Sequence, residues 1–225
     1  MTLNRRGVFI TGSDTGVGKT TVACYMIRML EKAGFHPAPR KPIESGCVRT
    51  SDGTLIARDA QAMTESMLKP IATKRVCPYR FSAAISPARA AQLQNVPLDI
   101  DKLVTACDSE PEEVLIIEGA GGLLSPLATQ CTNADLAKCL GIPLILVVAD
   151  RLGCINHSLL SLVTAESLGI KTLAVIINRL PYTAPPPIEM DNFAELKAMT
   201  DIPLFRLQDL DTHNDALLKL VVANQ

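Results

Sequence analysis

Residues 7–21 read Gly-Val-Phe-Ile-Thr-Gly-Ser-Asp-Thr-Gly-Val-Gly-Lys-Thr-Thr, and this stretch decides the fold. The apolar run from Gly7 to Gly12 predicts a buried strand, and the spacing of apolar residues from Lys19 to Ala33 predicts a helix. Glycines between them let backbone N–H groups face phosphate oxygens, and the helix N-terminus adds partial positive charge. The stretch therefore predicts a phosphate-binding loop, with a glycine-rich helix cap as the alternative.

Two polar residues at the end of this loop have side chains that suit the binding of a nucleotide and its metal ion. Lys19 is suited to contact the β- and γ-phosphates, and Thr20 to offer its hydroxyl to Mg²⁺. The loop is one residue longer than the strict motif, because Ser13 stands six positions before Lys19. Partition and septum-site ATPases carry a second lysine where this chain has Asp14, so that class is disfavoured. We expect the nucleotide to be held by Gly16, Val17, Gly18, Lys19, Thr20 and Thr21.

Short apolar runs and helical patterns alternate along the rest of the chain. We expect further strands at 36–41, 114–117, 144–149 and 172–177. We expect further helices at 56–67, 87–93, 100–106, 157–168, 193–199 and 215–222. Apolar strands separated by helices predict a parallel sheet that is covered on both faces. The predicted fold class is α/β: a three-layer, P-loop NTPase-like fold with a mainly parallel sheet.

The second predicted strand is weak, because it contains Pro37 and Pro39. The proline-rich stretch 182–188 is predicted to be a surface loop rather than a linker. Since the strand pattern continues beyond it, we expect residues 1–225 to form a single domain.

The composition disfavours several classes of protein. Lys plus Arg is 22 and Asp plus Glu is 23, for a net charge of −1, and aromatic residues are 4%. This balance disfavours a nucleic-acid partner. The longest apolar run, 142–149, is too short to cross a membrane, and the N-terminus lacks a signal-peptide pattern. The 7 cysteines include no Cys-x-x-Cys pair, which indicates reduced thiols. We expect a cytoplasmic protein without a membrane partner.

Ligands of parallel sheets bind at the carboxyl ends of the strands. The apolar run 114–117 delivers Glu118 to such a position, where a carboxylate meets Mg²⁺, and the glycines that follow let a ligand approach closely. Lys41, after the second strand, could face the γ-phosphate or be a surface lysine. Asp59 could cap a helix or be a solvated charge, and Asn156 could cap a helix or contact a ligand.

Five motifs, taken in their order along the chain, resemble those of the dethiobiotin synthetase family. They are the loop from Gly12, Lys-Pro-x-x-Ser-Gly from Lys41, Asp59-Ala60, Glu118-Gly-Ala-Gly-Gly and the segment Leu152-Gly-Cys-Ile-Asn-His. The resemblance implies a homodimeric ligase that depends on ATP and Mg²⁺. It would carboxylate 7,8-diaminononanoate (7,8-diaminopelargonate) with CO₂ and close the ureido ring. The implied products are dethiobiotin, ADP and phosphate, formed through a carbamate and a phosphorylated carbamate.

The resemblance also implies roles for single residues. Lys41 matches the catalytic lysine, which would act with Lys19, and Ser45 matches a serine that contacts the substrate. The implied Mg²⁺ ligands are Thr20, Asp59 and Glu118. Besides the loop, the implied nucleotide-binding residues are Asp59, Glu118, Gly119, Ala120, Gly121, Asn178 and Arg179, with Asn178 at the adenine. The segment that receives the substrate carboxylate, from the neighbouring subunit in the family, is Gly153, Cys154, Ile155 and Asn156.

Some positions depart from the family pattern. Gly16 stands where some members have Glu, Ala88 replaces a histidine, and residues 204–208 lack the Gly-x-Ile-Pro element near the adenine. ATP is favoured over GTP, because Asn178-Arg179-Leu-Pro lacks the aspartate of the guanine-binding Asn-Lys-x-Asp.

The alternative functions for the chain are a cobyrinate-type synthase, a P-loop switch ATPase and a degenerate relative that binds nucleotide without turnover. The first needs a glutaminase domain, for which 225 residues leave no room. The second should show a basic or amphipathic tail, but residues 215–225 carry only one lysine.

Overall fold

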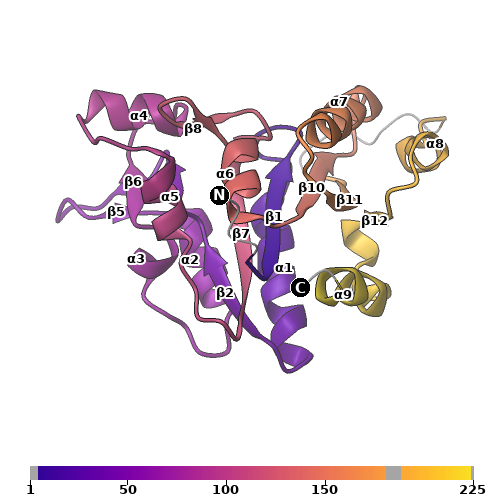
Figure 1. The fold of residues 1–225 in the computed structure, drawn as a ribbon, viewed down its shortest axis with the longest axis horizontal. Helices are drawn as coiled ribbons and strands as arrows, with labels where there is room; N and C mark the ends of the chain where they lie inside the picture. The colour runs from indigo at the N-terminus through magenta and orange to yellow at the C-terminus, as the bar shows by residue number, and fades with distance from the viewer. Residues whose placement is uncertain (1–4, 181–188, 224–225) are drawn as a thin grey trace.

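The computed structural model describes residues 5–180 and 189–223. In this part of the chain six strands form one parallel sheet, ordered β12-β11-β10-β1-β7-β2 (Figure 1). Their bounds are β1 (Gly7–Gly12), β2 (His36–Arg40), β7 (Glu113–Gly122), β10 (Leu144–Ala149), β11 (Thr172–Asn178) and β12 (Leu204–Arg206). The predicted parallel sheet is confirmed, whereas the predicted loop 182–188 lies outside the described residues.

Helices cover both faces of this sheet and give the predicted three layers (Figure 1). Because successive side chains of a strand point to opposite faces, Val8 and Ile10 pack on one side and Phe9 on the other. The first face carries α1 (Lys19–Lys32), α2 (Arg58–Glu65) and α9 (Asn214–Val222). The second carries α4 (Pro87–Leu93), α5 (Ile100–Ala106), α6 (Asn133–Leu140), α7 (Cys154–Ser167) and α8 (Asn192–Met199).

Short elements complete the fold, and the sequence analysis missed them together with α6 and β12. They are the strand pairs β3 (Ile43–Ser45) with β6 (Tyr79–Phe81), β4 (Val48–Arg49) with β5 (Leu55–Ile56) and β8 (Pro126–Ala128) with β9 (Cys131–Thr132), helix α3 (Thr73–Val76) and the 3₁₀ turn Leu207–Asp209. Helix α6 did carry a signal: Thr132 and Asp135 form a capping box at its start.

Two predicted helix starts are wrong. The helix expected from Ile56 begins at Arg58, because Ile56 pairs in β5. The helix expected from His157 begins at Cys154, because Gly153 adopts φ 90° and starts the helix there. That left-handed conformation favours glycine.

The weak strand over residues 36–41 is confirmed as β2, which lies at an edge of the sheet. Pro37 and Pro39 are tolerated there, because an edge strand need not donate hydrogen bonds on its outer side. The strand expected to end at Ile117 instead continues to Gly122 as β7. Glu118 therefore lies within β7, level with Ile10 of β1.

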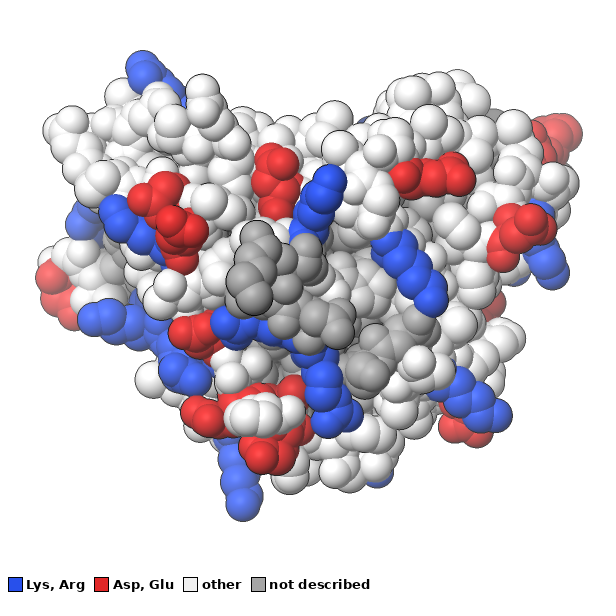
Figure 2. Space-filling view, in the orientation of Figure 1, with Lys and Arg blue, Asp and Glu red and all other residues white. Residues whose placement is uncertain are grey.

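The surface carries charges of both signs. On the face in Figure 2, lysines and arginines are interspersed with aspartates and glutamates. All seven cysteines lie in the described ranges, and each is a free thiol. Within residues 5–180 and 189–223, no helix has both the length and the apolar character that a membrane crossing requires.

Candidate functional site

The predicted phosphate loop joins β1 to α1 and turns on two glycines. Gly18, the N-cap of α1, has φ 102°, and Gly16 has φ 74°. Lys19 begins the helix, is 6% exposed and donates through Nζ to the Asp14 carbonyl at 2.9 Å. Burial, reinforced by the charge of Lys41, lowers the pKa of Lys19 to about 8. An anion bound beside this ammonium would favour its charged form.

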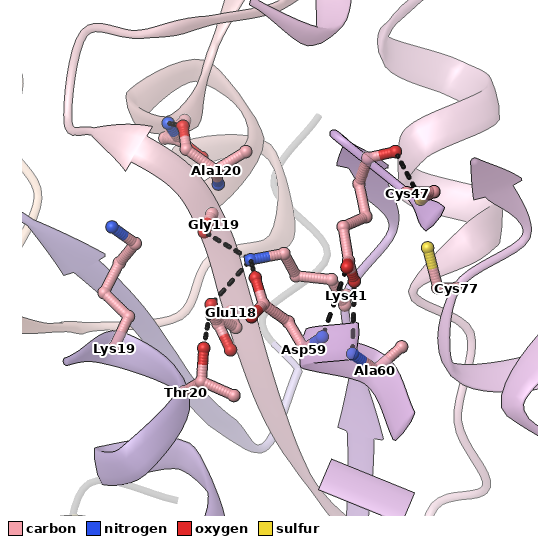
Figure 3. Close-up of polar contacts among 12 residues, drawn as sticks. Lys19, Thr20, Lys41, Cys47, Asp59, Ala60, Cys77, Glu118, Gly119 and Ala120 are labelled. Carbon is pink, nitrogen blue, oxygen red and sulfur yellow. Dashed lines mark hydrogen bonds and ion pairs between the residues drawn. The ribbon is translucent and has the colours of Figure 1, made fainter. Parts of the chain in front are cut away.

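Lys41 lies between two carboxylates that come from different elements (Figure 3). Its Nζ is 2.8 Å from Asp59 Oδ2 and 2.5 Å from Glu118 Oε1, and it also donates to the Gly119 carbonyl at 3.3 Å. Because Lys41 is 3% exposed, its interpretation as a surface lysine is wrong. Burial opposes its charge, but Glu118 and Asp59 outweigh this effect and raise the pKa of Lys41 above the ordinary value of lysine.

Asp59 reaches this cluster from the first turn of α2. The N-cap of that helix is Ala57, so the interpretation of Asp59 as the cap is wrong. Burial opposes ionisation of Asp59, but Lys41 holds the pKa of the carboxyl below its usual value.

Glu118 is 1% exposed and joins the cluster to the phosphate loop. Thr20 donates through Oγ1 to Glu118 Oε1 at 3.0 Å. The other oxygen, Oε2, is buried without a hydrogen-bond partner among the described residues. Burial raises the pKa of Glu118, against the attraction of Lys41.

A cavity of about 700 Å³ opens over these groups at the carboxyl end of the sheet. It brings together most of the predicted site residues: Gly16, Gly18, Lys19, Thr20, Thr21, Lys41, Ser45, Asp59, Glu118, Ala120 and Gly121. Its lining also includes residues that the sequence analysis did not propose: Thr15, Glu44, Ala84, Ile85, Ser86, Pro87, Ser125 and Pro126. Ser86 and Pro87 directly precede Ala88, the position that departs from the family pattern, and Glu44 lies inside the motif that begins at Lys41.

Asn178 and Arg179 lie behind the phosphate loop, outside the lining of this cavity. Asn178 donates through Nδ2 to the Val17 carbonyl at 2.9 Å and accepts from Gln208 Nε2 at 3.3 Å. Arg179 is exposed. The loop and the end of β11 are therefore in contact, in a place that the cavity does not reach.

The predicted carboxylate-receiving segment, residues 153–156, forms the start of α7 and is not part of the cavity lining. Asn156 is exposed within the first helical turn, so its interpretation as the helix cap is wrong, since Gly153 occupies that position. Beside this segment, Arg151 pairs with Asp14 of the phosphate loop at 3.1 Å.

We expect Gly18→Ala to lower the free energy of unfolding by about 1–3 kcal/mol, because it places a side chain in a left-handed conformation against a neighbour. A Cβ on Gly18 would lie 2.2 Å from Asn178 Nδ2. Urea unfolding followed by circular dichroism measures the loss. Gly16→Ala is the control, since its φ is also positive but the structure places no described atom within 4 Å of its Cβ. Equal losses in both variants would show that the Asn178 contact contributes nothing.

Comparisons with known proteins match most of the chain. A family model described as "AAA domain" matches residues 6–207. The chain is 38% identical over 199 residues to an ATP-dependent dethiobiotin synthetase BioD of Ruthia magnifica subsp. Calyptogena magnifica, covering 88% of this chain and 89% of that protein. It is 35% identical over 221 residues to the one from Vesicomyosocius okutanii subsp. Calyptogena okutanii, covering 97% and 98%.

Solved structures resemble the chain at lower identity. A ParA family ATPase from Chlorobium tepidum matches with a TM-score of 0.52 and 14% identity, covering 99% of this chain and 90% of that one. The septum site-determining protein MinD from Pyrococcus horikoshii, complexed with Mg-ADP, matches with a TM-score of 0.50 and 15% identity, covering 98% and 89%. Such likeness speaks for the fold alone, and it confirms the predicted P-loop NTPase-like class.

Proposed function

The chain belongs to the dethiobiotin synthetase family, and from this membership we infer that it is an ATP-dependent ligase of biotin biosynthesis. It acts on small molecules: it carboxylates 7,8-diaminononanoate with CO₂ and closes the ureido ring, giving dethiobiotin, ADP and phosphate. The relatives favour this activity over the alternatives of a switch ATPase or a degenerate nucleotide-binding protein.

The reaction has three chemical steps. One amine of the substrate attacks CO₂ and loses a proton, which gives a carbamate. A carbamate oxygen then takes the γ-phosphoryl group of ATP and releases ADP. Finally the second amine attacks the carbonyl carbon of this mixed anhydride, the C–O bond breaks and phosphate leaves. Because both amines belong to one molecule, the cavity needs only to hold them in place for ring closure.

The carbamate and the γ-phosphate are both anions, so the cavity must offset their repulsion. We assign this task to Lys19 and Lys41, which both line the cavity and come from different elements (Figure 3). Both ammonium groups are buried, where a charge interacts more strongly with a ligand than it would in water. Exclusion of water would also protect the mixed anhydride from hydrolysis.

The residues around Glu118 fit a Mg²⁺ ion. Two carboxylates and one hydroxyl, from Asp59, Glu118 and Thr20, supply the hard oxygen ligands that Mg²⁺ prefers, and Mg²⁺ commonly takes its other ligands from phosphates and water. The unpartnered Oε2 of Glu118 is a further sign that an electropositive group belongs there. When bound, Mg²⁺ would neutralise charge that builds on the phosphates during transfer. We propose these three residues as its ligands.

The remaining assignments extend beyond the cavity. We propose that Ser45 contacts the diamine from the cavity lining. We also propose that the backbone of 119–121 approaches the bound ligands, since Ala120 and Gly121 line the cavity. Asn178 and Arg179 are proposed to bind the adenine, since they adjoin the phosphate loop. Residues 153–156 are proposed to receive the substrate carboxylate of a second copy in a homodimer. This is supported by two observations: these residues are not among those that line the cavity of their own chain, and the adjacent Leu152 is 91% exposed.

Two further proposals concern the whole chain. We propose that residues 1–225 form a single domain, which is supported by a sheet that draws its strands from Gly7 to Arg206. We propose a cytoplasmic location, which is supported by seven free thiols.

The observation that carries the catalytic proposal is the buried contact of Lys41 with Asp59 and Glu118 beside the phosphate loop. The test is release of phosphate from ATP and Mg²⁺ with bicarbonate present, with and without the diamine. We expect release to depend on the diamine and to match formation of the cyclic urea. Release without the diamine, or absence of release by folded protein, would contradict the proposal.

A further inference from the structure

Glu44 is a buried carboxylate that no step above uses. It lies on β3, is 6% exposed, and accepts two backbone hydrogen bonds at the start of α2. Its Oε1 accepts from the Asp59 N–H at 3.2 Å, and its Oε2 accepts from the Ala60 N–H, also at 3.2 Å. The two oxygens therefore hold consecutive residues of the first helical turn.

These bonds supply what the helix itself lacks. The first N–H groups of a helix have no partner within the helix and are usually satisfied by the side chain of the N-cap residue. Here the N-cap is Ala57, whose side chain cannot accept a hydrogen bond. Glu44 takes over this role from a distant strand, and its negative charge is favourable at a helix N-terminus.

The same residue, Asp59, is held at two points by one short segment. Its backbone N–H bonds to Glu44 and its carboxylate bonds to Lys41, only three positions earlier in the chain. The Asp59 side chain is 40% exposed, so packing alone does not fix its position. The carboxylate is therefore directed into the cavity by Glu44 on one side and Lys41 on the other.

We propose that Glu44 is a positioning residue for Mg²⁺ binding, which acts by holding the backbone of Asp59. This inference rests on the proposed role of Asp59 as a Mg²⁺ ligand. Residues that orient metal ligands through hydrogen bonds commonly contribute about 10- to 100-fold to metal affinity. Glu44 itself donates no ligand in this arrangement.

The test compares Glu44→Gln with Glu31→Gln. Glu31, on α1, also accepts a backbone bond through both oxygens, at 3.1 and 3.0 Å from the Leu68 N–H, but beyond the far end of α2. Calorimetry of a non-hydrolysable ATP analogue over a series of Mg²⁺ concentrations gives the half-saturating Mg²⁺ concentration. We expect about a tenfold rise for Glu44→Gln and none for Glu31→Gln. No rise for Glu44→Gln would overturn the proposal.

A double-mutant cycle separates positioning from general destabilisation. If Glu44 acts through Asp59, then Glu44→Gln should add nothing to the rise caused by Asp59→Ala, because the two residues form one unit. A full further rise in the double variant would show that Glu44 acts by another route. If circular dichroism shows Glu44→Gln to be unfolded, Glu44→Asp replaces it in both experiments, with the same expected direction.

Measurements of binding and of turnover distinguish a failure of the Glu44 proposal from a failure of the proposed function. A wild-type protein that binds the Mg²⁺–nucleotide complex but ignores the diamine would contradict the proposed function. The Glu44 comparison would still be decided by the binding data.

Discussion

Lys41→Ala is expected to reduce diamine-dependent phosphate release by about 10²- to 10³-fold. In other enzymes, removal of one group that stabilises the charge developing in the transition state lowers the rate by about this factor. Lys41 is buried, and it lines the cavity together with Lys19 and Thr20 of the predicted phosphate-binding motif. After its removal, the approach of carbamate to the γ-phosphate would be opposed by the charges of Asp59 and Glu118. Steady-state release of phosphate, measured at saturating diamine, gives the effect on kcat.

This variant also leaves Glu118 buried without its cation. Breaking a buried ion pair costs about 3–5 kcal/mol of the free energy of unfolding, so denaturant unfolding must show that the variant is folded under the assay conditions. Lys102→Ala is the matched control, because Lys102 forms a long, exposed pair with Asp99 at 3.9 Å on α5. Near-normal turnover by folded Lys41→Ala would remove Lys41 from the mechanism.

Glu118→Gln is expected to raise the half-saturating Mg²⁺ concentration for turnover at least about tenfold, since loss of a residue that merely orients a ligand already costs that much. The amide keeps the size of the side chain but removes its charge. Lys41 keeps Asp59 as a partner at 2.8 Å, so the fold should survive the change. Phosphate release titrated with Mg²⁺ measures the effect, and excess Mg²⁺ should restore part of the rate.

Glu113→Gln supplies the comparison for this experiment. Glu113 is the first residue of the same strand, β7, where its side chain accepts a hydrogen bond from the Glu110 N–H at 2.9 Å. Its Mg²⁺ dependence should equal that of the wild type. An unchanged Mg²⁺ dependence in Glu118→Gln would count against a metal role for Glu118.

The sheet was predictable from sequence because its strands are apolar on both faces. Continuous runs such as 144–149 leave few alternatives once helices are recognised between them. Short elements were not predictable in the same way: β3 and β6 have three residues each, too few for a period to appear. Their pairing depends on contacts between distant parts of the chain.

The residues of the candidate site also differ in how far the local sequence predicts them. Lys19 and Thr20 follow from a local motif, and the structure places both at the cavity. Glu118 follows from the apolar run that precedes it. The resemblance to a family supplied the roles of Lys41 and Asp59, for which the residue patterns alone left a surface lysine and a helix cap as open interpretations. Glu44 was missed because its function depends on meeting the start of α2, 15 residues along the chain. No spacing rule records such a contact.

The position of β2 at the edge of the sheet bears on how copies of this protein can meet. An exposed edge strand is a template on which another chain can add a strand and begin to aggregate. Pro37 and Pro39 remove two N–H donors from the five residues of β2, and alternate residues of a parallel strand direct their N–H groups to the same side. The outer side of β2 therefore lacks these donors. In addition, its last four residues are buried, and the Pro39 carbonyl already accepts a hydrogen bond from Arg40 Nη1 at 2.8 Å. Open-ended growth of the sheet past β2 is disfavoured, which protects the protein at high concentration and while it is still folding.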